Sequence, residues 1–174
     1  MNKHAIKSGA MIGLISIILS LLLYIVDSTL FASFWVGILI FIAIIGLVCY
    51  FGIQHRNEEG GFMAFGPAWM YSMQTFVVAG LIGTVFRIAL FNVIDPGLAE
   101  VVTDAAVENT ISMLEGFNTP DEVIEESIEK TREQTMDGFT VLGNIKAFGI
   151  GILIYAVISL ITGLIIRRNE PENL

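Results

Sequence analysis

The sequence predicts an all-α fold, an integral membrane four-helix bundle with an acidic helical hairpin between its third and fourth spans. Of its 174 residues, 55% are apolar and 15% charged, and the mean hydropathy is +0.76. A soluble domain has roughly 45–50% apolar and about 25% charged residues. Four nearly uncharged stretches have the length of about 20 residues that crosses a bilayer as a helix. We therefore expect a single membrane domain over residues 1–174 rather than a soluble enzyme.

The first two spans are expected at residues 10–26 and 30–51. The first follows Lys7 and ends before Asp27. A cleaved signal peptide is the alternative interpretation, because basic residues before an apolar run also mark an export signal. The second has Trp35 and Tyr50 near its ends, where amphipathic rings favour the headgroup level, and it carries no charge.

The third and fourth spans are expected at residues 68–94 and 141–166. The third contains Arg87, and the sequence 95–97, Asp-Pro-Gly, stops its helix because proline cannot continue it. Arg167 and Arg168 end the fourth span.

The basic residues of the short segments fix an expected orientation. Those on one side of the membrane are Lys3, Lys7, Arg56, Arg167 and Arg168. The turn at 27–33 on the other side has no basic residue. Because Lys and Arg favour cytoplasmic loops, we expect a multi-pass protein of the bacterial cytoplasmic (inner) membrane with both termini in the cytoplasm.

The outer segment 95–140 holds most of the negative charge. It has twelve acidic against two basic side chains, so its net charge is −10, whereas the whole chain has −8. Apolar residues at helical spacing predict a first helix that ends at the sequence Gly-Phe-Asn, residues 116–118. Thr119 is then expected to cap a second helix, with Pro120 at its first position and acidic residues in its first turn. We expect this acidic hairpin to lie on the periplasmic surface.

The chain resembles a family in the turn before the third span and at the start of the first. The matching residues are Lys7, Gly9, Gly13, Glu59, Gly60, Gly61, Phe62, Phe65, Gly66 and Ala68. In these it resembles the uncharacterised bacterial four-span membrane proteins catalogued as domain of unknown function four thousand one hundred ninety-nine. The resemblance covers most of the chain and implies no activity. The chain departs from the pattern at Pro67, where a polar residue is expected.

Two ionisable side chains inside the spans are candidate functional residues. Arg87 either extends to the headgroups or lipid phosphates, or pairs with Asp27 or a loop carboxylate, or serves a substrate pathway. Lys146 lies about one turn inside the outer end of the fourth span, so it is expected to be an interfacial anchor.

Small residues provide a second group of candidates. Gly9 and Gly13 form a small-xxx-small motif, which lets helices approach closely and is expected to seal packing within the chain. A homodimer face is the alternative. His55, Glu58 and Glu59 resemble a metal cluster in composition, but we expect them to lie in a solvated turn without a second histidine nearby.

No catalytic motif occurs in the sequence, and the negative charge argues against nucleic-acid binding. We therefore expect no enzymatic activity and no cofactor. The expected function is that of a membrane accessory, assembly or sensing protein whose outer hairpin contacts a membrane or periplasmic protein partner, besides the membrane lipids. The alternative is a small oligomeric transporter or channel with Arg87 near its pathway.

Overall fold

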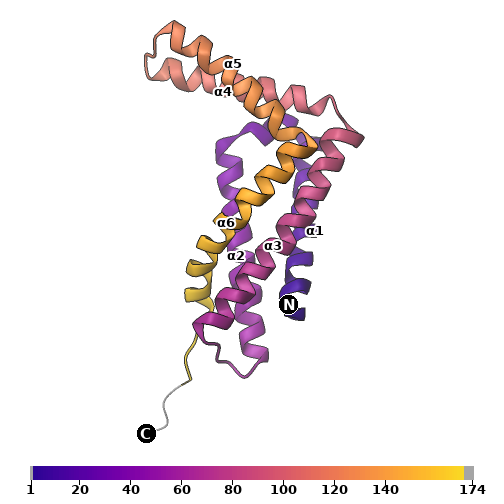
Figure 1. Ribbon diagram of the computed structural model, residues 1–174, viewed down its shortest axis with the longest axis vertical. Helices are drawn as coiled ribbons and strands as arrows, with labels where there is room; N and C mark the ends of the chain where they lie inside the picture. The colour runs from indigo at the N-terminus through magenta and orange to yellow at the C-terminus, as the bar shows by residue number, and fades with distance from the viewer. Residues whose placement is uncertain (1, 171–174) are drawn as a thin grey trace. The chain divides into compact units, whose positions relative to one another are not determined.

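The structure, a computed structural model, describes residues 2–170 and is helical throughout its main elements (Figure 1). The elements are α1 (Lys3–Val26), η1 (Ser28–Ala32), α2 (Phe34–Glu58), α3 (Phe65–Ala89), η2 (Leu90–Ile94), α4 (Leu98–Gly116), α5 (Asp121–Phe139) and α6 (Val141–Ile166). The short element η1 is a 3₁₀ helix and η2 is a π-helical turn.

Four helical segments are long and apolar enough to cross a membrane. They are Lys3–Val26, Phe34–Glu58, Phe65–Ile94 and Val141–Ile166. In lipid a spanning chain must satisfy its backbone hydrogen bonds internally, which a helix does. The expected all-α, multi-pass membrane architecture is confirmed.

The second and third helices extend beyond the expected bounds of their spans, because residues outside the apolar stretch continue the helix. The second helix extends past residue 51 to Glu58, because neither proline nor a pair of glycines interrupts it before Gly60 and Gly61. The third begins at Phe65, ahead of the expected residue 68. Pro67 is compatible with this start because it lies in the first turn, where its missing N–H has no partner within the helix.

The chain divides into two compact units. The first, called the inner unit, contains residues 1–18, 40–83 and 148–174, and the second, called the outer unit, contains residues 19–39 and 84–147. Each of the four long apolar segments contributes one part to each unit.

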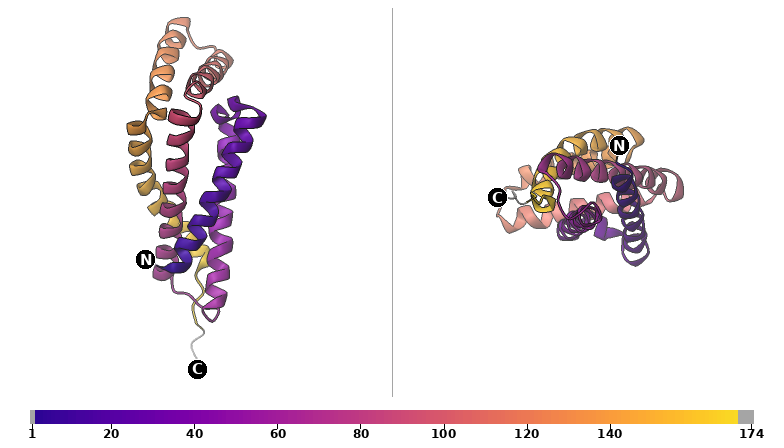
Figure 2. Two further views of the ribbon diagram at one scale, coloured as in Figure 1. Left: turned by 90° about the vertical axis from the view of Figure 1, so that its right-hand side faces the viewer. Right: turned by 90° about the horizontal axis from the view of Figure 1, so that it is seen from below.

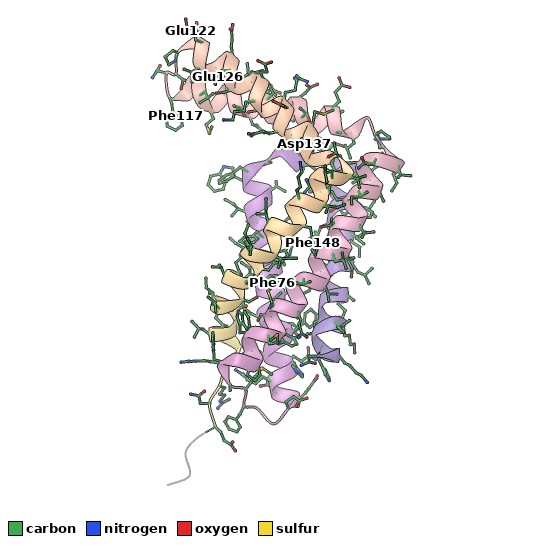
Figure 3. The ribbon with its side chains drawn as sticks, viewed as in Figure 1. Phe76, Phe117, Glu122, Glu126, Asp137 and Phe148 are labelled. Carbon is green, nitrogen blue, oxygen red and sulfur yellow. The ribbon has the colours of Figure 1, made fainter. Side chains whose placement is uncertain are left out.

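The inner unit packs parts of α1, α2, α3 and α6 around two small cores. One core comprises Ala5, Ala68, Tyr71 and Ile166, and the other comprises Ile12, Val48, Phe76 and Ala79. Phe76, labelled in Figure 3, stacks on Tyr155 with ring centroids 5.7 Å apart. After α6, Arg168 exchanges two backbone hydrogen bonds of 2.9 Å with Met63, so the chain beyond α6 is attached to the turn between α2 and α3.

The outer unit has its own core and carries two further helices. Its buried residues are Leu90, Phe91, Leu98, Ala99, Val102 and Phe139. Helices α4 and α5 lie side by side, connected by a short turn, as Figures 1 and 2 show. We call residues 98–139 the acidic hairpin. Its first helix also contacts η1.

The start of α5 corrects one expectation. Thr119 does not cap this helix, which begins at Asp121 after Pro120 in the N-cap position, without a side-chain cap. Asn118 adopts a left-handed conformation (φ 53°), and the Thr119 N–H donates to the carbonyl oxygen of Leu114. The backbone N–H of Thr119 therefore completes the C-terminal cap of α4, and α5 begins two residues later.

Candidate functional site

The acidic hairpin is buried at one end. Leu98, Ala99 and Val102 of α4 pack with Phe139 of α5 in the core of the outer unit. The side-chain amide of Asn92 donates to the Phe139 carbonyl oxygen at 3.0 Å, and that of Asn109 donates to the Ala32 carbonyl oxygen at 3.3 Å. The hairpin is thus held by apolar burial at its base and by a polar contact farther along α4.

The other end of the hairpin exposes apolar side chains among carboxylates. Phe117 is 77% exposed, and Met113 and Val123 are exposed as well. Figure 3 shows Phe117, Glu122 and Glu126 toward the turn that connects α4 and α5, and Asp137 at the opposite end of α5. Phe117 is thus a large apolar side chain left exposed at the end of a strongly acidic hairpin. We call Met113, Phe117 and Val123 the apolar tip.

The two helices of the hairpin contact each other through polar groups in their middle. Arg132 donates to Asp104 at 2.7 Å, and the hydroxyl oxygens of Thr110 and Thr131 are 3.5 Å apart. The Arg132–Asp104 pair is about half exposed, and such surface pairs contribute only about 0–1 kcal/mol. Most of the hairpin's negative charge therefore stays unneutralised by basic side chains.

Arg87 lies against an aromatic ring. Its guanidinium carbon is 5.5 Å from the centroid of the Phe139 ring, and within residues 2–170 no ion pair involves it. The alternative in which it pairs with Asp27 is wrong, because the Asp27 carboxylate accepts instead from the hydroxyl and backbone N–H of Thr29. Arg87 is an exposed residue of α3 whose guanidinium group is packed against Phe139.

Lys146 makes a loose surface contact. Its Nζ lies 3.9 Å from Oδ2 of Asp137, and both side chains are more than half exposed. This geometry matches an interfacial anchor better than a buried functional group.

The small-residue motif of α1 faces α3 within the inner unit. A Cβ added to Gly9 would lie 2.7 Å from Cβ of Val78, and one added to Gly13 would lie 2.8 Å from Cβ of Ile82. These distances are shorter than real Cβ contacts, so both glycines allow the two helices to approach closely.

The glycines and the aromatic residue between α2 and α3 have local roles. Gly60 and Gly61 have φ values of +100° and +87°, and the Gly61 N–H donates to the Arg56 carbonyl oxygen at 2.9 Å. This is the pattern of a helix ended by a left-handed glycine. Phe65 and Gly66 open α3, and a Cβ at Gly66 would meet nothing within 4 Å.

The expectation of a solvated turn around His55 is wrong. His55 and Glu58 lie in the last turns of α2, and His55 is only 5% exposed. A second histidine does lie nearby: the ring of His4 stacks on His55 with centroids 4.5 Å apart, and His4 Nδ1 is 3.7 Å from Oε2 of Glu58. No motif in the sequence connects His4 with His55, although His4 lies beside Lys3 and so at the same expected membrane boundary as His55 and Arg56.

Comparison with known proteins identifies the family of the chain. The family described as "Protein of unknown function (DUF4199)" matches residues 7–168, which confirms the resemblance noted in the sequence. The chain belongs to this family. No curated protein and no solved structure matches it.

Proposed function

We propose that this member of an uncharacterised membrane family is a non-enzymatic accessory, assembly or sensing protein whose acidic hairpin contacts a protein partner with a basic surface. The observation that carries the proposal is the apolar tip at the end of the acidic hairpin, whose eleven acidic and two basic side chains give it a net charge of −9. Charge of one sign speeds encounter with a partner of the other sign, and a buried aromatic residue then supplies affinity. The partner's expected contact surface is therefore an apolar pocket surrounded by Lys and Arg.

The proposed orientation places the hairpin outside the bacterial cytoplasmic membrane and both termini inside. Two features support it. The basic residues used for the sequence argument all belong to the inner unit, and the acidic hairpin belongs to the outer unit. A side with Lys and Arg in its short loops is expected to face the cytoplasm.

Cysteine labelling tests the orientation. In a Cys49→Ser background, Asn118→Cys and Asn169→Cys each provide one thiol, in the hairpin turn and after α6 respectively. In intact spheroplasts a membrane-impermeant maleimide is expected to label Asn118→Cys and to label Asn169→Cys only after the membrane is permeabilised. The reverse pattern would overturn the orientation.

Site-specific photo-crosslinking tests the partner. A benzophenone amino acid replaces Phe117 in one variant and Phe34 in a control, because Phe34 is a 73% exposed aromatic residue outside the hairpin. In intact cells the Phe117 position is expected to give a discrete protein adduct that the Phe34 position does not give. Mass spectrometry of the adduct should identify a crosslinked segment bordered by Lys and Arg.

Charge neutralisation makes the crosslinking result specific. The combined change Glu122→Gln, Glu125→Gln, Glu126→Gln and Glu129→Gln is expected to reduce the adduct several-fold at unchanged protein level. Raising the salt concentration during crosslinking of membrane vesicles should have the same direction of effect, because salt screens exposed charges. A protein adduct whose yield is unchanged by the substitutions and by salt would contradict the proposal, and so would adducts to lipid alone.

A further inference from the structure

We propose that His4, His55 and Glu58 form a binding site for a divalent transition-metal ion of the Zn²⁺ class. One ligand atom from each residue lies within 4.8 Å of the other two. Imidazole nitrogens with a carboxylate oxygen favour Zn²⁺, Co²⁺ or Ni²⁺ over Mg²⁺ and Ca²⁺, which prefer oxygen ligands. The inference concerns the inner unit and does not depend on the partner proposed for the hairpin.

An unsatisfied nitrogen of His55 is the second observation. Nδ1 of His55 is buried and has no hydrogen-bond partner within the described residues, whereas Nε2 lies 3.0 Å from the Asn2 side-chain nitrogen. A buried polar group without a partner costs about 1–3 kcal/mol. A metal ion bound at Nδ1 would remove this cost.

A cavity beside His55 has room for an ion and for water. The cavity has a volume of about 200 Å³, and its lining includes His4, Lys7, Ser8, His55 and Glu58. Since a water molecule takes about 30 Å³, the ion can keep water beside its three protein ligands. Three protein ligands and one water are a common four-coordinate arrangement for zinc.

The contacts around His55 make it the fixed ligand. Its ring stacks on Tyr71, with centroids 5.1 Å apart, and the Tyr71 hydroxyl donates to Ser8 Oγ at 2.7 Å. Tyr71 itself is 1% exposed. The position of the His55 ring is therefore determined by the packing of α1, α2 and α3.

His4 is the movable ligand. The rings of His4 and His55 are nearly parallel, with an interplanar angle of 17°. A nitrogen lone pair lies in its ring plane, so two stacked rings do not direct their lone pairs at one point. The side chain of His4 is 51% exposed in the first turn of α1, so it can turn out of the stack. Metal binding and ring stacking are thus alternative states of this site.

Asn2 controls the tautomer of His55. Oδ1 of Asn2 accepts from the His4 N–H at 2.9 Å, which directs its side-chain nitrogen to donate to His55 Nε2. This places the His55 proton on Nδ1, whereas a metal bound at Nδ1 requires the proton on Nε2. In Asn2→Asp the carboxylate can accept from the His4 N–H and also from a protonated His55 Nε2. This favours the tautomer that metal binding at Nδ1 requires, in the way that carboxylates support zinc-bound histidines.

Isothermal titration of the full-length chain in detergent micelles, purified without a polyhistidine tag, tests the site with ZnCl₂ alone. One ion per chain is expected to bind, and CoCl₂ is expected to give the intense visible absorption of a four-coordinate site. MgCl₂ in excess is expected not to displace the ion. Weak binding of many ions with no cobalt band would overturn the proposal.

Single substitutions locate the ligands. His4→Ala and Glu58→Gln are each expected to weaken Zn²⁺ binding at least tenfold, whereas the matched control Glu59→Gln leaves it unchanged. Both altered side chains are exposed, so the fold is preserved without them. Equal affinity of His4→Ala and the unmodified chain would overturn the site.

Two variants that should strengthen binding complete the test. Asn2→Asp is expected to tighten Zn²⁺ binding about tenfold, in line with the effect of groups that support metal ligands. Lys7→Gln is expected to tighten it as well, because it removes a positive charge from the lining of the cavity. Weaker binding in Asn2→Asp would contradict coordination through Nδ1 of His55.

Discussion

The guanidinium carbon of Arg87 lies 5.5 Å from the centroid of the Phe139 ring, which connects the last part of α3 to the end of α5. The same ring stacks on Phe91, with centroids 4.1 Å apart and an interplanar angle of 8°. A cation above an aromatic face is attracted by about 0.5–1 kcal/mol where exposed and by about 2 kcal/mol where desolvated. Arg87 therefore has a structural partner in the outer unit that needs neither a carboxylate nor a substrate.

A double-mutant cycle measures this contact. In reversible unfolding with a denaturing detergent, Arg87→Leu and Phe139→Leu are expected to show a coupling free energy of about 0.5–2 kcal/mol. Arg87→Lys should keep part of the coupling and remain inserted, because an ammonium group can also lie above a ring and extend toward headgroups. A coupling near zero would show that the two side chains act independently, and loss of function in Arg87→Lys at normal abundance would favour a substrate role for the guanidinium group.

Gly9→Ala is expected to destabilise the inner unit. The added Cβ would meet Cβ of Val78 at 2.7 Å and the backbone oxygen of Thr75 at 2.8 Å, so α1 and α3 must separate. Such overpacking costs about 1–3 kcal/mol. Gly46→Ala is the matched control in α2, because its Cβ would meet nothing within 4 Å. The same unfolding measurement applies, and equal stability of the two variants would contradict the close approach of α1 and α3.

Gly60→Ala and Gly61→Ala are expected to loosen the turn between α2 and α3. At φ values of +100° and +87° a side chain is strained, with a cost of about 1–3 kcal/mol for each position. Hydrogen exchange of the Met63 and Arg168 amides should become faster, because each of these N–H groups donates to the carbonyl oxygen of the other residue. Gly66→Ala in α3 is the control. Its added Cβ would meet nothing within 4 Å, so both exchange rates should stay unchanged.

The Asp27 carboxylate is expected to titrate below its ordinary pKa of 3.8. The hydroxyl and backbone N–H of Thr29 donate to it and lower its pKa by stabilising the charged form. Its contribution to stability is therefore present above the pKa of the unfolded chain and is lost as the pH falls through the lower pKa of the folded state. NMR titration of the Asp27 carboxyl group in micelles measures its pKa. Thr29→Val should raise this pKa, because it removes the hydroxyl donor.

The four spans could be predicted from the sequence because a long uncharged stretch has few other stable states in lipid. The ends of the helices could not be predicted, because charged residues such as Arg56 and Glu58 are compatible both with a helix that continues into water and with a loop. The start of α5 was misplaced for a related reason. Threonine is a common N-cap residue, but in the structure Pro120 holds the N-cap position of α5, and Thr119 follows the left-handed Asn118 with its N–H bonded to the end of α4.

The histidine cluster was beyond sequence reasoning for a different reason. His4 and His55 are distant in the sequence, and only the packing of α1 on α2 and α3 brings their rings into contact. Periodicity indicates which face of a helix is apolar, but these spans are apolar on all faces, so it does not indicate which faces meet. Gly9 could be recognised as a packing residue from its spacing to Gly13, although its neighbour Val78 could not.

The contacts of Ile166 impose an order on the assembly of the inner unit. Its side chain fills the space beside Gly52, and its carbonyl oxygen accepts from Nη1 of Arg56 at 2.9 Å. During synthesis the first three spans precede the fourth by the whole length of the acidic hairpin. Until α6 is present, the end of α2 lacks both the Ile166 side chain beside Gly52 and the carbonyl oxygen that Nη1 of Arg56 binds, so this part of the inner unit is the last to be completed.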